Sequence, residues 1–288
     1  MKRLAWLGIL FGLVVPTLAF AATTPVHVSM VVTGTVSVNP DGSVKAYTID
    51  HADQLPSGVQ SLLKSSVPEW TFDAIKAAHK TVPTQARMSV QVTGTVTGTS
   101  KQKVDGKTVE QNTVQIGVAD IDLHCPPPHA DMTFVSGCDP NAGLAHVAGV
   151  PPAYPIRAVR AGMEAVVDLR LEIGRDGRVL HAAVRQVNLY SRIPDLSLYR
   201  KIFADPTLEA AHEWRYRVPI SGPNAGRDRW MLDQRVKFYI DGGHVATIGY
   251  GQWLAYLPGP IAAIPWADQG STTVTRLPEM TVEASLMR

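Results

Sequence analysis

The sequence predicts an α+β protein of two tandem small units, each an antiparallel sheet with one or two helices packed on one face. Apolar and polar residues alternate over Ala165–Ile173, which indicates a strand with one face in the core and one in water. Asp41-Gly42 and Asp176-Gly177 are typical of tight turns between paired strands. The order strand, Asp-Gly turn, strand, helix, Trp-x-aromatic and long strand occurs twice, with Trp70-x-Phe72 matching Trp214-x-Tyr216. We therefore predict an internal duplication; one large mixed domain is the alternative.

The composition allows two hydrophobic cores and argues against a general nucleic-acid binder. The chain has 288 residues, of which 45% are hydrophobic and 18% are charged, and its net charge is only +2. Residues 151–243 hold 15 Lys and Arg, mostly Arg, against 11 Asp and Glu, whereas residues 25–123 hold 8 against 9, mostly Lys. This difference favours two units with separate surfaces.

The first 21 residues have the pattern of a signal peptide. Lys2 and Arg3 precede the apolar run Leu4–Leu18, and Ala19-Phe20-Ala21 has the form of a cleavage site. We expect cleavage there and export of the remainder to the periplasm. The alternative is an uncleaved segment that anchors the chain in the inner membrane, facing the periplasm.

The first unit is predicted over residues 22–123. Alternation, β-branched residues and turn signals favour four longer strands, one short strand and one helix. The predicted strands are Val26–Asn39, Val44–Asp50, Ala86–Gly98 and Thr108–Ile121, and the predicted helix is Pro56–Ser65. Val59, Leu62 and Leu63 give that helix an apolar stripe, and Trp70-Thr71-Phe72 is expected to be a short strand.

A linker is predicted over residues 124–150. Cys125 and Cys138 are expected to form a disulfide, because an even pair of cysteines in an exported chain is usually oxidised. His124, His129 and His146 raise the alternative of a metal site. No strong zinc signature fits their spacing, so no metal is predicted.

The second unit is predicted over residues 151–243. Gly162 is expected to end its first helix, and Asp205-Pro206 is expected to begin its second. The predicted helices are Ile156–Ala161 and Pro206–Glu213, and the predicted strands are Ala165–Ile173, Val179–Val187, Trp214–Tyr216 and Arg229–Asp241. Residues 188–203 are expected to be an irregular insertion.

A tail is predicted over residues 244–288. Val245–Ala267 carries no formal charge, but its prolines and glycines argue against a membrane-spanning helix. We expect an extended segment packed on a domain.

The second unit resembles the TonB C-terminal domain family. The resemblance lies in Tyr154-Pro155 before the short helix, the hairpin turn at Gly177, and residues 205–211 leading into Trp214-Arg215-Tyr216. It covers roughly a third of the chain, and the first unit is similar to a degenerate copy. The family fold that this implies is a small sheet with helices on one face.

The resemblance implies a function in protein binding. Domains of this family capture an extended segment of an outer-membrane receptor, and a final strand with a free edge accepts such a segment as an added strand. The expected edge is Arg229–Ile240. Its predicted partner-binding residues are Arg229, Met231, Asp233, Arg235, Lys237 and Tyr239. The alternative is that this edge pairs with the first unit or with a second subunit.

The segment Thr275–Ala284 is similar to the short recognition segment at the start of TonB-dependent receptors. A segment of this kind can add itself to an edge strand, in cis or in trans. The alternative, which the sequence favours, is a disordered polar end.

The chain departs from an energy transducer of this family in two respects. It lacks a clear uncleaved anchor, and residues 124–150 are too short to cross a periplasm. We therefore expect a periplasmic protein-binding module, linked to outer-membrane transport through a receptor partner. A transducer with an uncleaved anchor and a self-associating envelope assembly protein are the alternatives; membrane contact is expected only through the N-terminal segment.

No catalytic residue or cofactor is predicted. His212 lies beside Glu213, but no nucleophile, second carboxylate or phosphate-binding loop accompanies it. An enzyme is the least favoured alternative.

Overall fold

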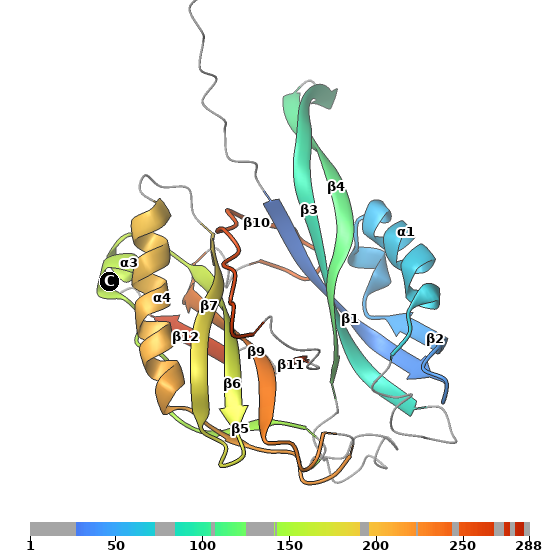
Figure 1. Cartoon of the computed structure of the whole chain (residues 1–288). Coiled ribbons are helices and arrows are strands. Elements are labelled where there is room, and N and C mark those ends of the chain that lie inside the picture. The colour runs from blue at the N-terminus through green and yellow to red at the C-terminus, as the bar shows by residue number, and fades with distance from the viewer. Residues whose placement is uncertain are drawn as a thin grey trace, which may run out of the picture.

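Two sheets form the centre of the molecule, with helices on their outer sides (Figure 1). The structure is a computed structural model of the chain. It describes residues 27–72, 84–104, 107–124, 141, 143–190, 196–222, 224–243, 248–267, 274–276 and 280–284. The predicted signal peptide and both cysteines of the predicted disulfide lie outside the described residues.

The first sheet consists of four strands of the first unit and one strand from the tail. Its strands are β1 (His27–Val38), β2 (Val44–Ile49), β3 (Thr84–Val104), β4 (Lys107–His124) and β10 (Leu254–Tyr256). β1 pairs with β3 along one edge and with β2 and β10 along the other, and β4 covers the outer edge of β3. All these pairs are antiparallel.

One face of the first sheet is covered by helix α1 (Ser57–Ser66), between two 3-10 turns (Ala52–Gln54 and Val67–Glu69). Val59 and Leu63 of α1 are buried against alternate residues of β1 and β3, including Val32 and Val90. The predicted apolar stripe of this helix is therefore the face that contacts the sheet.

The second sheet has a similar centre of three antiparallel strands. Its strands are β6 (Ala165–Gly174), β7 (Val179–Leu189), β9 (Arg229–Ile240), β11 (Val274–Arg276) and β12 (Met280–Ala284). β6 lies between β7 and β9 in antiparallel pairing, while β11 and β12 pair with the outer edge of β9 in parallel. Helices α3 (Ile156–Arg160) and α4 (Leu196–Glu213) belong to this unit, and α4 covers β6 and β7. The predicted α+β fold of two tandem units is confirmed.

The two Asp-Gly turns have the same backbone hydrogen bonds. In each unit the carbonyl of the turn glycine accepts a hydrogen bond from the second aromatic residue of the Trp-x-aromatic motif. The distance is 2.8 Å from Phe72 N to Gly42 O and 2.8 Å from Tyr216 N to Gly177 O. Both glycines have positive φ, 88° and 76°. This match supports the duplication hypothesis, although common descent of the units stays a prediction.

β3 in the first unit and β9 in the second occupy equivalent positions, but their outer edges pair with different strands. In the first unit the edge of β3 is paired with β4, an antiparallel strand of 18 residues that follows it directly. In the second unit the corresponding edge of β9 is paired with β11 and β12, which follow it by more than thirty residues and run parallel. The tail thus occupies the place that β4 has in the first unit.

The last helix of the second unit is longer than the sequence indicated. We predicted an irregular insertion up to Phe203 and a helix that starts at Asp205-Pro206, but α4 begins at Leu196 and contains Pro206. Phe203 and Ala211 are both buried, because apolar residues continue at helical spacing on both sides of the proline. The missing N–H at Pro206 costs one helical hydrogen bond, and this packing outweighs it.

Segments outside the two predicted units also pair with strands of those units. Strand β5 (Ala145–Ala148), inside the predicted linker, pairs with β8 (Arg215–Arg217) as a separate two-stranded sheet. Residues 248–267 follow an extended path in which β10 joins the first sheet and Leu257 pairs with Leu189 of the second. The expected extended, packed segment is thus observed in the described part of the tail. None of the helices among the described residues has the length and apolarity needed to cross a membrane.

Candidate functional site

The six predicted partner-binding residues occupy one face of β9. Even-numbered residues of β9, such as Leu232 and Phe238, are buried in the core with α4. Odd-numbered residues therefore point to the opposite face, toward the first sheet (Figure 1). The structure brings the six together as one row.

Three of the four charged members of this row form ion pairs with β6. Arg229 contacts Glu172 (2.9 Å), Asp233 contacts Arg170 (2.5 Å), and Arg235 contacts Asp168 (2.9 Å). Arg170 and Asp233, and likewise Asp168 and Arg235, lie directly opposite one another in the register, whereas Arg229 and Glu172 are diagonal neighbours. These charges thus bind one another across the sheet. The alternation of opposite charges in β6 and β9 was visible in the sequence and could have predicted this ladder.

The other members of the row have different surroundings. Met231 is only 9% exposed, and it packs against Ile264 and Ala267 of the tail. Lys237 and Tyr239 are half-buried, and Lys237 lines a cavity between the sheets.

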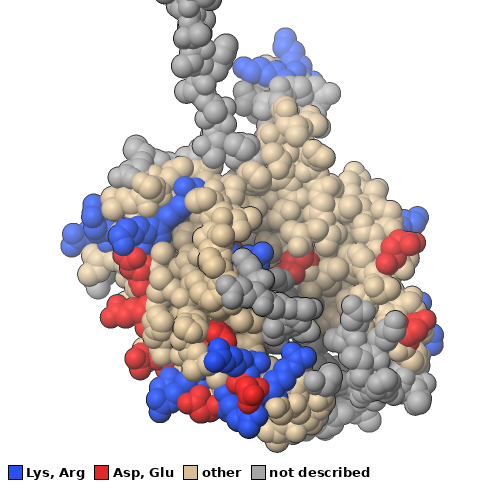
Figure 2. All heavy atoms as spheres, viewed as in Figure 1, with Lys and Arg blue, Asp and Glu red and all other residues tan. Residues whose placement is uncertain are grey.

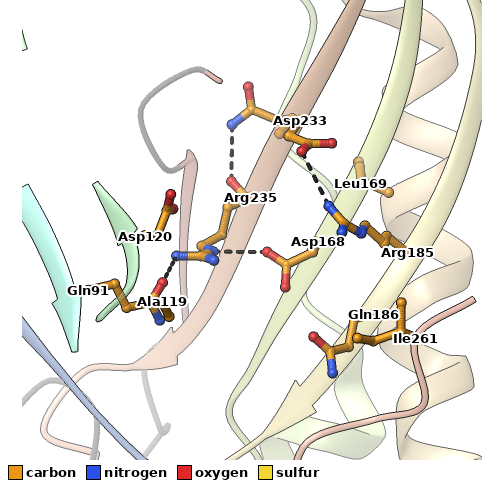
Figure 3. A pocket seen from close by; sticks show the side chains of 11 residues that line it. Gln91, Ala119, Asp120, Asp168, Leu169, Arg185, Gln186, Asp233, Arg235 and Ile261 are labelled. Carbon is orange, nitrogen blue, oxygen red and sulfur yellow. Dashed lines mark hydrogen bonds and ion pairs between the residues drawn. The ribbon is translucent and has the colours of Figure 1, made fainter. Parts of the chain in front are cut away.

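Arg235 also connects the two units. Its Nη1 donates a hydrogen bond of 2.8 Å to Gln91 Oε1 on β3, while its Nε donates to Asp168 Oδ1 on β6 (Figure 3). Around it lies a cavity of about 330 Å³ that both sheets line. Strand β9 is thus supported from its face by the first unit, a role that the sequence did not indicate.

A second cavity of about 340 Å³ lies beside the first. Tyr190, Tyr256 and Lys237 contribute to its lining, together with residues of β1. Burial raises the pKa of Tyr256. Sequence reasoning missed these tyrosines, because one lies just after β7 and the other lies in the tail.

The outer edge of β9 is occupied. We predicted a free edge, but Val274–Arg276 lies opposite Met231–Asp233 and Met280–Ala284 lies opposite Val236–Ile240. Val282 is 8% exposed and belongs to the core of the second unit, and Met280 packs against that core. Apart from Val274, the tail residues that pair with β9 belong to the segment that resembles a receptor recognition sequence.

The residues that carry the family resemblance are structural. The Tyr154 hydroxyl donates to Met163 O (2.7 Å), and Trp214 Nε1 donates to Val150 O (3.0 Å). Tyr216 is buried, and Gly177 forms the turn that contacts it. With Pro155, which precedes α3, these residues build the unit that supports β9.

His212 is exposed on α4. No group of three or more His, Cys, Asp or Glu side chains in the described ranges could hold a metal ion. On the face shown in Figure 2, acidic and basic side chains are mixed, except at the basic tip of the β3–β4 hairpin.

Comparisons with protein-family models, with curated proteins and with solved structures found no match. The resemblance to the TonB C-terminal domain family therefore stays a prediction from the residues of this chain.

His146 is expected to make the stability of the second unit pH-dependent. Burial beside Trp214 and Tyr216 lowers its pKa below the ordinary 6.5. The unfolded chain therefore binds the proton more readily, and the free energy of unfolding falls as the pH falls below about 6.5. We expect His146→Phe to reduce the change in urea midpoint between pH 7 and pH 5.

The control for this prediction is His212→Gln, because His212 is exposed. This variant should keep the pH dependence of the wild type. An equal pH dependence in His146→Phe and in the wild type would contradict the prediction.

Proposed function

We propose that this chain is an exported, non-enzymatic binding protein that captures an extended segment of an envelope protein as an added strand on the outer edge of β9. The observation that supports this proposal is the pairing of that edge with β11 and β12. A strand from a remote part of the sequence lies there in register with β9, so the edge has the geometry that strand addition requires. A segment of an outer-membrane receptor is the partner that the family resemblance implies.

The first unit supports the proposal by contrast. Its corresponding edge, on β3, is paired with β4 from Arg87 to Val104. An incoming strand would have to separate a long hairpin at that edge. At β9 it would have to replace only strands of three and five residues. We therefore assign capture to the second unit and support of β9 to the first, through the Arg235–Gln91 hydrogen bond.

The chemistry of the edge favours a peptide over a small molecule. A strand on β9 gains backbone hydrogen bonds along the edge, and one row of its side chains enters the apolar core around Phe238. The charges of Arg229, Asp233 and Arg235 are paired within the sheet. Apolar side chains at alternate positions should therefore contribute more to affinity than charge.

Photo-cross-linking tests this function. Tyr239, which lies opposite Glu283 in the register, is replaced by p-benzoylphenylalanine in the full chain that also carries Val282→Asp to loosen the tail. After illumination with an envelope extract, we expect cross-links to an extended segment of a partner. A peptide with the sequence of residues 275–284 in excess should reduce their yield by about tenfold, because it competes for the same edge.

The matched control carries the photoreactive residue at Tyr47 of β2 in the first unit. Its cross-links should not respond to the peptide. Strand capture at β9 would be refuted if the cross-links at position 239 were equally insensitive to the peptide.

A further inference from the structure

The tail forms two short parallel strands on β9. β11 covers Met231–Asp233 and β12 covers Val236–Ile240. β9 itself has 12 residues, so a strand that paired with it continuously would form more hydrogen bonds than β11 and β12 form in these two registers. The described residues of the tail thus pair with only part of β9.

The side chains of β12 fill the same core that an added strand would enter. Val282 lies opposite Phe238, and both belong to the core of the second unit. Met280, two residues earlier, projects to the same side and packs against this core. An incoming strand needs the space of these two side chains, so the tail and the partner cannot occupy the edge together.

We propose that the β11–β12 tail is an internal competitor of the partner strand, so that the protein captures its partner only when the tail leaves β9. This inference rests on the function proposed above. It also describes the partner: an extended segment that presents apolar side chains at the two alternate positions that Met280 and Val282 occupy. A charged side chain at either position would enter the core without a partner and would weaken binding.

Competition in cis has a predictable effect on affinity. A segment tethered to the same chain acts at an effective concentration on the order of millimolar. The apparent dissociation constant of any strand added in trans is raised by the inverse of the fraction of molecules whose edge is open. A tail that is docked in 90% or more of the molecules therefore weakens binding by about tenfold or more.

The test measures binding of a fluorescein-labelled peptide with the sequence of residues 275–284 by fluorescence anisotropy. The full chain is compared with Val282→Asp, which places a charge in the core position of β12. We expect Val282→Asp to bind the peptide about tenfold or more tightly than the wild type. Val150→Asp, the same change at a valine that is 72% exposed, should bind like the wild type.

A second variant locks the tail instead of releasing it. Lys237 and Thr281 are opposite one another in the register, so Lys237→Cys with Thr281→Cys places two thiols where neighbouring strands can be joined. The oxidised protein should lose peptide binding, and a reductant should restore it. Thr281→Cys alone controls for the new thiol, and hydrogen exchange of the β12 amides reports whether the tail is docked.

The outcomes separate the two proposals. If Val282→Asp and the wild type bind the peptide equally well, or if the oxidised lock still binds it, the tail is not a competitor, and strand capture stands. If no variant binds the peptide while the β12 amides of the wild type are protected, the tail is only a structural strand. That result would overturn strand capture and competition together.

Discussion

Replacing Trp214 with alanine is expected to lower the free energy of unfolding of the second unit by about 3–5 kcal/mol. The indole is fully buried, and its Nε1 donates a hydrogen bond of 3.0 Å to Val150 O. Alanine would leave a cavity and an acceptor without this donor. Urea denaturation followed by circular dichroism measures the loss.

Trp70, the equivalent tryptophan of the first unit, provides the control. It is only half-buried at the side of its core, so Trp70→Ala should cost about 1–2 kcal/mol because less apolar surface is lost. Equal losses at the two positions would contradict the prediction that the loss depends on how deeply the indole is buried. Calorimetry of both variants would also show whether the two units unfold together.

The sequence was sufficient for the fold class because the signals that define it are local. Alternation in β6 and β1 gave the strands and their buried faces. The Asp-Gly turns at residues 41–42 and 176–177 gave the hairpins. Each signal depends on residues that are neighbours in the chain, and the structure confirms the resulting pattern of two sheets with helices on one face of each.

The pairing at the candidate site could not be predicted in the same way. The choice between cis, trans and no pairing for Thr275–Ala284 depends on contacts with β9, more than thirty residues earlier. The polar composition of this segment favoured disorder, but Val282 is buried against the core of the second unit, which favours docking of the segment. Similarly, α4 begins before Pro206 because Phe203 and Ala211 both pack in the core. A rule that places a helix start at Asp-Pro from local sequence does not include such packing.

The row of charges on β9 illustrates the same limit. Arg235 in isolation is typical of an exposed strand residue that steers a ligand. Its pairing with Asp168 follows from the antiparallel register of β6 and β9, and its contact with Gln91 follows from the position of the first sheet. The position of a residue in the sequence therefore predicts the face of the strand on which its side chain lies. It does not predict which residue that side chain contacts.

Gly177→Ala is expected to lower the free energy of unfolding by about 3 kcal/mol or more. The residue has a φ of 76°, which an L side chain rarely adopts, and a Cβ there would lie 2.0 Å from Tyr216 O. The turn would have to move away from β8, which breaks the hydrogen bond from Tyr216 N to Gly177 O. Urea denaturation at neutral pH measures the loss.

Gly162→Ala separates the two causes of this loss. Gly162 also has a positive φ, 62°, but a Cβ there would meet nothing within 4 Å. Only the backbone strain remains, so we expect a loss of about 1 kcal/mol. The excess at Gly177 then measures the close approach of the turn to β8. If both variants lost the same 1 kcal/mol or so, the turn would be able to move away from Tyr216 at little cost, and the contact shared by the two Asp-Gly turns would not be a determinant of the fold.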